Sequence, residues 1–132
     1  MARRDFLLRL IEQMGRVLAG IRARLLGGEV QGVRAELRDV IAWSGIDLDL
    51  AEQVDVPTLL GLLSLGGSLD VAKCVLVADV LGVEALRLQA AGGAAEGAAR
   101  LRAKALALYR AARPLVTGGD AEAIEERITT LT

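Results

Sequence analysis

The sequence predicts an all-α protein, a bundle of two long helical hairpins joined by short helices, in one domain that covers residues 1–132. The length is that of a single domain. Four Gly-Gly pairs, which begin at residues 27, 66, 92 and 118, divide the chain. Glycine ends helices because it has no Cβ to clash in the left-handed conformation. Between the pairs, strong helix formers dominate and the alternation typical of strands is missing.

The first helix is predicted over residues 4–26. Its apolar residues recur at alternating spacings of four and three, which places them on one stripe. The stripe consists of Leu7, Ile11, Met14, Leu18, Ile21 and Leu25. Three arrangements fit this pattern: a helix packed in its own domain, a helix that pairs with a second copy, and a basic amphipathic helix on an anionic membrane.

A second helix is predicted over residues 29–43, and Gly45 is expected to end it. Its inward face is formed by Val33, Leu37, Val40 and Ile41. Residues 47–65 are typical of two short helices. Asp47 or Asp49 can cap the first, and Asp55 with the proline two residues later fits the start of the second.

The third long helix is predicted over residues 69–91, with Ser68 or Asp70 as its cap. It is apolar nearly all round, as expected of a helix surrounded by others. A fourth helix, over residues 94–112, ends shortly before a proline. A last helix is predicted to follow Gly119, with Asp120 as its cap, and to extend to about residue 130.

Four segments carry a resemblance to a known family. They are DFLLRLIEQM at residues 5–14, GSLD at 67–70, ADVL at 78–81 and ALALY at 105–109. On these segments the chain resembles a family of small, uncharacterised bacterial all-helical proteins with a tetratricopeptide-like fold, although its Ala-rich residues 90–99 depart from the family pattern. The resemblance implies a fold built from helical hairpins and implies no reaction.

The residue types exclude most catalytic and metal-binding chemistry. The chain has no His and one Cys, Cys74, so imidazole bases, ordinary zinc sites and an internal disulfide are ruled out. Asp79 in the most apolar helix is the candidate acid-base group, with Arg87 as its working partner, but we expect it to be paired with an arginine of a neighbouring helix. We expect no catalytic residue, no metal and no cofactor.

Other candidate sites also have structural interpretations. The acidic cluster of Asp47, Asp49, Glu52 and Asp55 lacks the spacing of a calcium loop, and helix caps explain two of its members. Cys74 is expected to be buried and inert. Trp43 and Tyr109 are expected to anchor helix ends in the core. With three aromatic residues in an almost neutral chain, nucleic-acid binding lacks its stacking platform.

Localisation and partners follow from hydropathy and composition. Charged residues interrupt every long apolar stretch, Arg9 and Glu12 break the one resemblance to a signal peptide, and we expect a cytoplasmic protein without a membrane span. The chain is 53% hydrophobic before its 15 Gly are counted, more than one small domain can bury. Exposed apolar patches mark interfaces, and a two-fold homodimer is the commonest way to cover them. The candidate interface residues are Leu7, Ile11, Met14, Leu18, Leu59, Leu60, Leu62 and Leu63.

Together these observations predict a non-catalytic protein-interaction or scaffold module that associates with itself or another protein. An apolar small-molecule or lipid carrier, with a pocket among the first, third and fourth long helices, is the alternative. An enzyme that uses a buried carboxylate is a third possibility.

Overall fold

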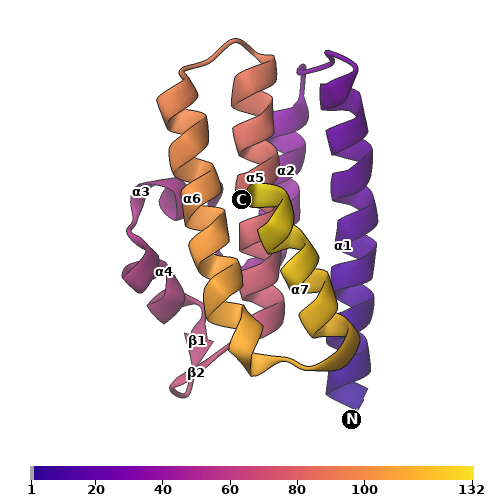
Figure 1. The fold of residues 1–132 in the computed structure, drawn as a ribbon, viewed down its shortest axis with the longest axis vertical. Helices are drawn as coiled ribbons and strands as arrows, with labels where there is room; N and C mark the ends of the chain where they lie inside the picture. Colours follow the sequence, from indigo (N-terminus) through magenta and orange to yellow (C-terminus); the bar gives the residue numbers. More distant parts are fainter. Residues whose placement is uncertain (1) are drawn as a thin grey trace.

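The structure is a computed structural model that describes residues 2–132, with the backbone alone for residues 2–8, 10 and 11. Four helices run up and down beside one another, and a fifth crosses their front (Figure 1). The four are α1 (Ala2–Leu26), α2 (Val33–Ile41), α5 (Val71–Ala90) and α6 (Ala95–Ala112), and the crossing helix is α7 (Gly118–Leu131). The described part of the chain is therefore helical almost throughout, as the sequence predicts.

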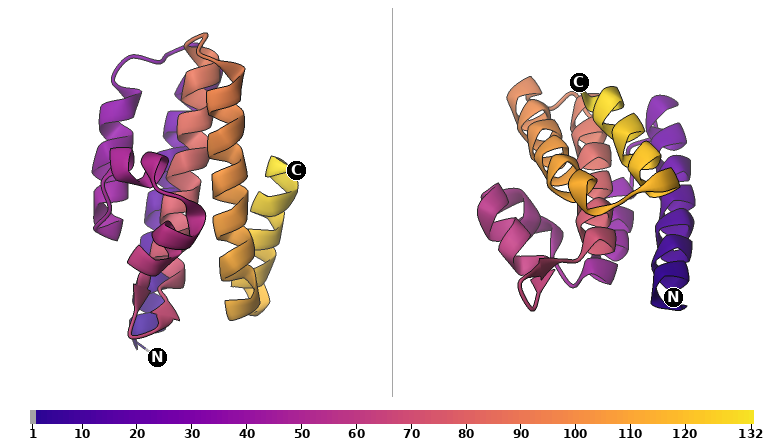
Figure 2. Two further views of the ribbon diagram at one scale, coloured as in Figure 1. Left: turned by 90° about the vertical axis from the view of Figure 1, so that its left-hand side faces the viewer. Right: turned by 60° about the horizontal axis from the view of Figure 1, so that its bottom comes forward.

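The remaining elements connect these helices. After α2 come the 3-10 turn η1 (Ala42–Ser44), α3 (Leu48–Gln53), α4 (Val56–Leu62) and the two-residue strands β1 (Ser64–Leu65) and β2 (Ser68–Leu69). A second 3-10 turn, η2 (Arg113–Leu115), leads from α6 towards α7. Figure 2 shows α3 and α4 to one side of the long helices, away from α1 and α7.

Helix α5 is the centre of the bundle because it is apolar on nearly every face. It packs against α1, α2 and α6. Its buried residues are Ala72, Cys74, Val75, Leu76, Val77, Ala78, Val80, Leu81, Val83, Glu84 and Ala85. On α1, the four described members of the predicted apolar stripe, from Met14 to Leu25, are at most 7% exposed and face this centre.

Helices α1 and α5 end in the same way. After α1, the Glu29 amide donates to the Arg24 carbonyl at 2.9 Å, and Gly28 adopts a φ of 86°. After α5, the Gly93 amide donates to the Leu88 carbonyl at 2.7 Å. Both are Schellman ends, in which glycine takes the left-handed position. These two Gly-Gly pairs therefore end helices, as predicted.

The other two Gly-Gly pairs do something else. Gly66 and Gly67 both have positive φ, 61° and 84°, and form the turn between β1 and β2, which pair in antiparallel register. Positive φ at both central residues is typical of a two-residue hairpin, so this pair belongs to a small β-hairpin that helix periodicity did not predict. The fourth pair begins α7, and Asp120 lies in the first turn of that helix instead of capping it.

One further boundary differs from the prediction. Helix α2 begins at Val33, not near residue 29, because Gly32 before it has a φ of 76°. The predicted inward residues of this helix are all buried. The caps of the short helices are those expected: Asp47 accepts from the Asp49 amide, and Asp55 accepts from the Thr58 amide. Helix α5 is capped by Asp70, whose carboxylate accepts from the Lys73 amide.

Candidate functional site

A groove of about 490 Å³ lies between α1 and α7, with α5 as its floor. Helix α7 crosses the bundle obliquely: its first turn lies near α1 and its last turn lies near α5 and α6 (Figures 1 and 2). The gap between α1 and α7 therefore widens towards the end of α1. We call this the α1–α7 groove. The α1 wall comprises Gly15, Leu18, Ala19, Arg22, Ala23 and Leu26. The floor comprises Asp79, Gly82 and Val83 of α5, together with Tyr109 of α6. The α7 wall comprises Glu126, Arg127, Thr130 and Leu131.

Three of the six residues on the α1 wall are glycine or alanine. Gly15, Ala19 and Ala23 follow one another at intervals of four residues, which places them on one face of the helix. The floor carries another glycine, Gly82, and a Cβ built there would meet no atom within 4 Å. Small side chains let a second helix approach closely. The groove therefore owes its shape to these four small residues, which in a helix covered on all sides would simply be core residues.

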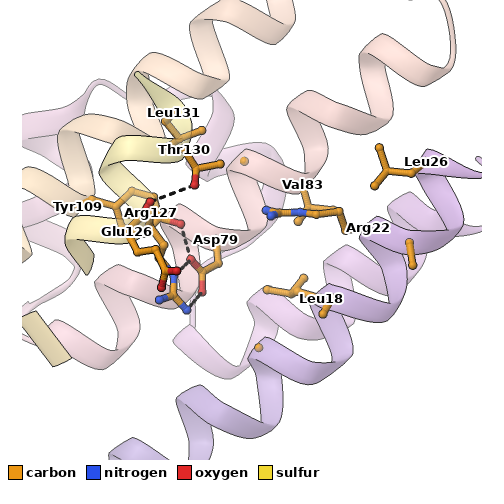
Figure 3. Close-up of a pocket in the computed structure, with 14 residues that line it drawn as sticks. Leu18, Arg22, Leu26, Asp79, Val83, Tyr109, Glu126, Arg127, Thr130 and Leu131 are labelled. Atoms are coloured by element: carbon orange, nitrogen blue, oxygen red, sulfur yellow. Dashed lines mark hydrogen bonds and ion pairs between the residues drawn. The ribbon is translucent and has the colours of Figure 1, made fainter. Parts of the chain in front are cut away.

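Three polar side chains from three helices meet at the floor of the groove (Figure 3). The Asp79 carboxylate of α5 accepts a hydrogen bond from the hydroxyl of Tyr109 on α6. It also accepts from Arg127 of α7, with Nε to Oδ1 at 2.8 Å and Nη2 to Oδ2 at 3.4 Å. The third guanidinium nitrogen, Nη1, donates to the Ala123 carbonyl at 3.2 Å. We call these three residues the Asp79 cluster.

The protonation of this cluster follows from burial and charge. Burial raises the pKa of Tyr109 well above its ordinary value, and the neighbouring Asp79 carboxylate raises it further. Burial disfavours the charge on Arg127, but the same carboxylate outweighs it and raises the pKa of Arg127. Tyr109 is therefore a neutral donor and Arg127 a cation at neutral pH. Both oxygens of Asp79 accept hydrogen bonds from these donors.

The prediction that Asp79 pairs with an arginine of a neighbouring helix is confirmed, with Arg127 as the partner. The alternative pairing with Arg87 is wrong. Arg87 binds Glu84 three residues earlier on α5, so its guanidinium is held at a different level of that helix. A proton-transfer pair of Asp79 and Arg87 does not exist in this fold.

The second polar cluster is centred on Glu84, a fully buried carboxylate. Arg34 of α2 and Arg87 both bind Glu84, and Arg34 also reaches Asp49 at 2.8 Å and Glu52 at 2.7 Å. Hydrogen bonding to Glu52, together with the surrounding carboxylates, raises the pKa of Arg34. We call these five residues the Glu84 cluster; they join α2, α3 and α5.

The predicted acidic cluster is divided between helix caps and these ion pairs. Asp47 and Asp55 cap α3 and α4, and Asp49 and Glu52 bind Arg34. Across the described residues, no group of His, Cys, Asp or Glu is arranged to hold a metal ion. Nor does any buried side-chain nitrogen or oxygen in this part of the chain lack a hydrogen-bond partner. Both clusters thus satisfy their own polar groups.

The candidate interface residues fall into three groups. Met14, Leu18, Leu59 and Leu63 are buried in the core of the chain itself, at most 7% exposed. Leu60 is partly buried against the core and Leu62 is 52% exposed. The side chains of Leu7 and Ile11 lie outside those that the structure describes.

Of the other residues that the sequence singles out, Cys74 and Tyr109 are buried and Trp43 is exposed. Cys74 is buried, and burial raises the pKa of its thiol to about 12, as expected of an inert cysteine. Tyr109 is buried as predicted. Trp43 is 61% exposed, which corrects the expectation that it anchors a helix end. It lies in the tight turn η1, where Ser44 takes the buried position and donates to the Ile41 carbonyl.

Sequence reasoning missed Arg127, Glu84 and Arg34. Glu84 carries the same signal as Asp79, a lone acid among apolar residues of α5, and could have been found by that rule. Arg127 could not, because nothing in its local pattern shows that α7 folds back over α5.

Comparisons with family models, with curated proteins and with solved structures found no match to this chain. In residues 2–132 no helix is both long enough and apolar enough to cross a membrane.

Proposed function

We propose that the chain is a non-catalytic protein-interaction module that binds an amphipathic helix of a partner in the α1–α7 groove. The observation that carries this proposal is the groove itself: a helix-lined furrow whose α1 wall carries three small residues and whose floor sets Gly82 and Val83 beside the Asp79 cluster. An amphipathic helix docks by laying its apolar face into such a groove. The tetratricopeptide-like arrangement of the two hairpins is part of the same proposal, because paired hairpins of that kind present grooves to partners.

The dimensions suit a short helix. The α1 wall extends from Gly15 to Leu26, and at about 1.5 Å per residue this is roughly 16 Å, or three helical turns. Three turns offer the i, i+3 or i+4, and i+7 positions through which helices anchor in grooves. The apolar contacts would come from Leu26 at the end of the α1 wall and from Leu131 on the α7 wall.

The charges of the floor support binding over catalysis. The charges of Asp79 and Arg127 neutralise each other, and the Tyr109 hydroxyl donates a further hydrogen bond to the Asp79 carboxylate. A general base must be within hydrogen-bond reach of a substrate proton, but here its oxygens already accept from the protein. The Asp79 cluster therefore acts as a structural floor in this proposal.

A leucine-faced peptide of about 16 residues, long enough to be appreciably helical, tests the proposal by calorimetry. Ala19→Trp fills the groove, and we expect it to weaken binding at least tenfold. Ala103→Trp is the matched control, because Ala103 is also an exposed mid-helix alanine but lies outside the groove. Equal losses in both variants, or no binding to the wild-type chain at millimolar peptide, would contradict the proposal.

Self-association remains a second part of the proposal. Leu62 at the end of α4 and Leu65 in β1 are 52% and 73% exposed, and they support a homodimer through this region. Leu62→Glu is the informative variant, since Leu63 is in the core. Light scattering on the wild-type chain tests the dimer: a mass near 13.9 kDa at micromolar concentration would exclude it.

A carrier for an apolar small molecule is the alternative, and the groove volume favours it. About 490 Å³ lies within the range of roughly 300–1,000 Å³ that is typical of small-molecule pockets. A fluorescent fatty acid separates the two functions. If it binds and the helical peptide does not compete, the carrier is the better description.

A further inference from the structure

We propose that the α1–α7 groove selects its partner helix by charge, taking an acidic side chain beside α1 and a basic one beside α7. This inference rests on the proposed function and states the chemistry of the partner. It follows from the two walls, which carry charges of opposite sign. Arg22 stands on the α1 wall and Glu126 on the α7 wall.

Arg22 extends from α1 towards Val83 of the floor, as Figure 3 shows. Its charge acts on the Asp79 cluster, where it opposes the rise in the pKa of Tyr109. The ion pairs of the described residues do not include Arg22. An exposed guanidinium on the wall of a groove is well placed to receive a carboxylate from the helix that occupies it.

Glu126 is the counterpart on the opposite wall. Its neighbour Arg127 points to Asp79, and the acid before it, Glu125, pairs with Arg113 at 2.6 Å. Within the described part of the chain, the carboxylate of Glu126 itself enters no ion pair. Among the four charges that line the groove, two are matched on the floor and two face an occupant from opposite sides.

A helix that lies in the groove exposes one flank to each wall. A partner with one acidic and one basic flank meets both charges favourably, whereas a partner with two like flanks meets one of them unfavourably. With its apolar face on the floor, such a helix turns the correct flank to each wall in one of its two directions and the wrong flanks in the other, so the walls fix its direction. The test of charge selection therefore compares the affinity of peptides whose two flanks have opposite charges with that of peptides whose two flanks have the same charge.

The experiment uses three peptides with the same leucine face: one with an acidic and a basic flank, one with two acidic flanks and one with two basic flanks. Because rim charges contribute modestly and like charges repel, we expect wild type to bind the mixed peptide about fivefold more tightly than either other. Arg22→Glu makes both walls acidic and should prefer two basic flanks. Glu126→Arg makes both walls basic and should prefer two acidic flanks.

The control is Arg110→Glu, an exposed charge reversal of the same size outside the groove, which should leave the wild-type order unchanged. Thermal unfolding verifies that each variant is folded. An identical order of peptides in all proteins, or an order that changes equally in the control, would overturn the charge selection and leave the groove proposal intact. Failure of every peptide to bind wild type would instead overturn the proposed function.

Discussion

Removing the Asp79 carboxylate should destabilise the fold by about 3 kcal/mol. In Asp79→Ala the hydroxyl of Tyr109 and the guanidinium of Arg127 lose their shared acceptor. Tyr109 is 4% exposed, and an unsatisfied buried donor costs about 1–3 kcal/mol. The side chain of Arg127 is 29% exposed and keeps its bond to Ala123, so water reduces its loss to about 1 kcal/mol.

Chemical denaturation monitored by circular dichroism measures this change, and a thermal melt gives an independent estimate. For a chain of this size, 3 kcal/mol corresponds to roughly a 10 °C fall in Tm. The triple variant Asp79→Leu, Tyr109→Phe and Arg127→Met removes the donors together with the acceptor. It should recover most of the loss, because replacing all partners of a buried polar group by apolar side chains is often close to neutral.

Two results would refute this reasoning. If Asp79→Ala unfolds within about 0.5 kcal/mol of wild type, the range of ordinary surface substitutions, the cluster does not stabilise the contact between α5, α6 and α7. If the triple variant is as unstable as Asp79→Ala, the cost lies in lost packing and not in unpaired donors.

Three further predictions concern the rest of the chain. Because burial raises the pKa of the Cys74 thiol from 9.0 to about 12, the unfolded chain loses that proton first. Stability should therefore fall as the pH rises from about 9 to about 12, and Cys74→Ala should reduce this slope in urea titrations. Arg34→Met leaves the buried Glu84 with one cation fewer and should cost about 3 kcal/mol by denaturation, whereas Arg38→Met, whose partners are exposed, should cost less than about 1 kcal/mol. Treatment with a chelator should leave helicity unchanged by circular dichroism; a large loss would show that a metal supports the fold.

Helix boundaries were predictable where a single residue type decides them. Asp47 and Asp55 cap short helices, and Gly28 adopts the left-handed conformation that a helix end requires. The same rule misled at Gly66 and Gly67, because paired glycines suit a two-residue hairpin as well as a helix end. A Gly-Gly pair therefore does not by itself distinguish a helix end from a β-hairpin.

Burial was predictable for continuous stripes and unpredictable for short leucine-rich segments. Leu59 and Leu63 are one helical turn apart and both enter the core, while Leu62 and Leu65 between and after them remain exposed. The sequence shows five leucines within seven residues but not which face the bundle covers. The candidate interface consequently included residues that belong to the interior.

The candidate site depends on a tertiary contact that has no local signal. Asp79 and Arg127 are separated by 48 residues and meet only because α7 turns back across α5 and α6. The prediction that Asp79 has an arginine partner follows from the cost of a buried charge. The identity of that partner, and the groove that forms beside it, follow from the path of the chain after residue 115.

The most direct test of the central claim, that the α1–α7 groove is a docking site for a helix, is an amide chemical-shift map recorded while the mixed-flank peptide is added. The account predicts that the largest shifts occur along Gly15–Leu26 of α1, at residues 79–83 of α5 and at residues 126–131 of α7, with small shifts in α3 and α4. Shifts centred on α3, α4 or the β-hairpin, or no shifts at saturating peptide, would contradict it.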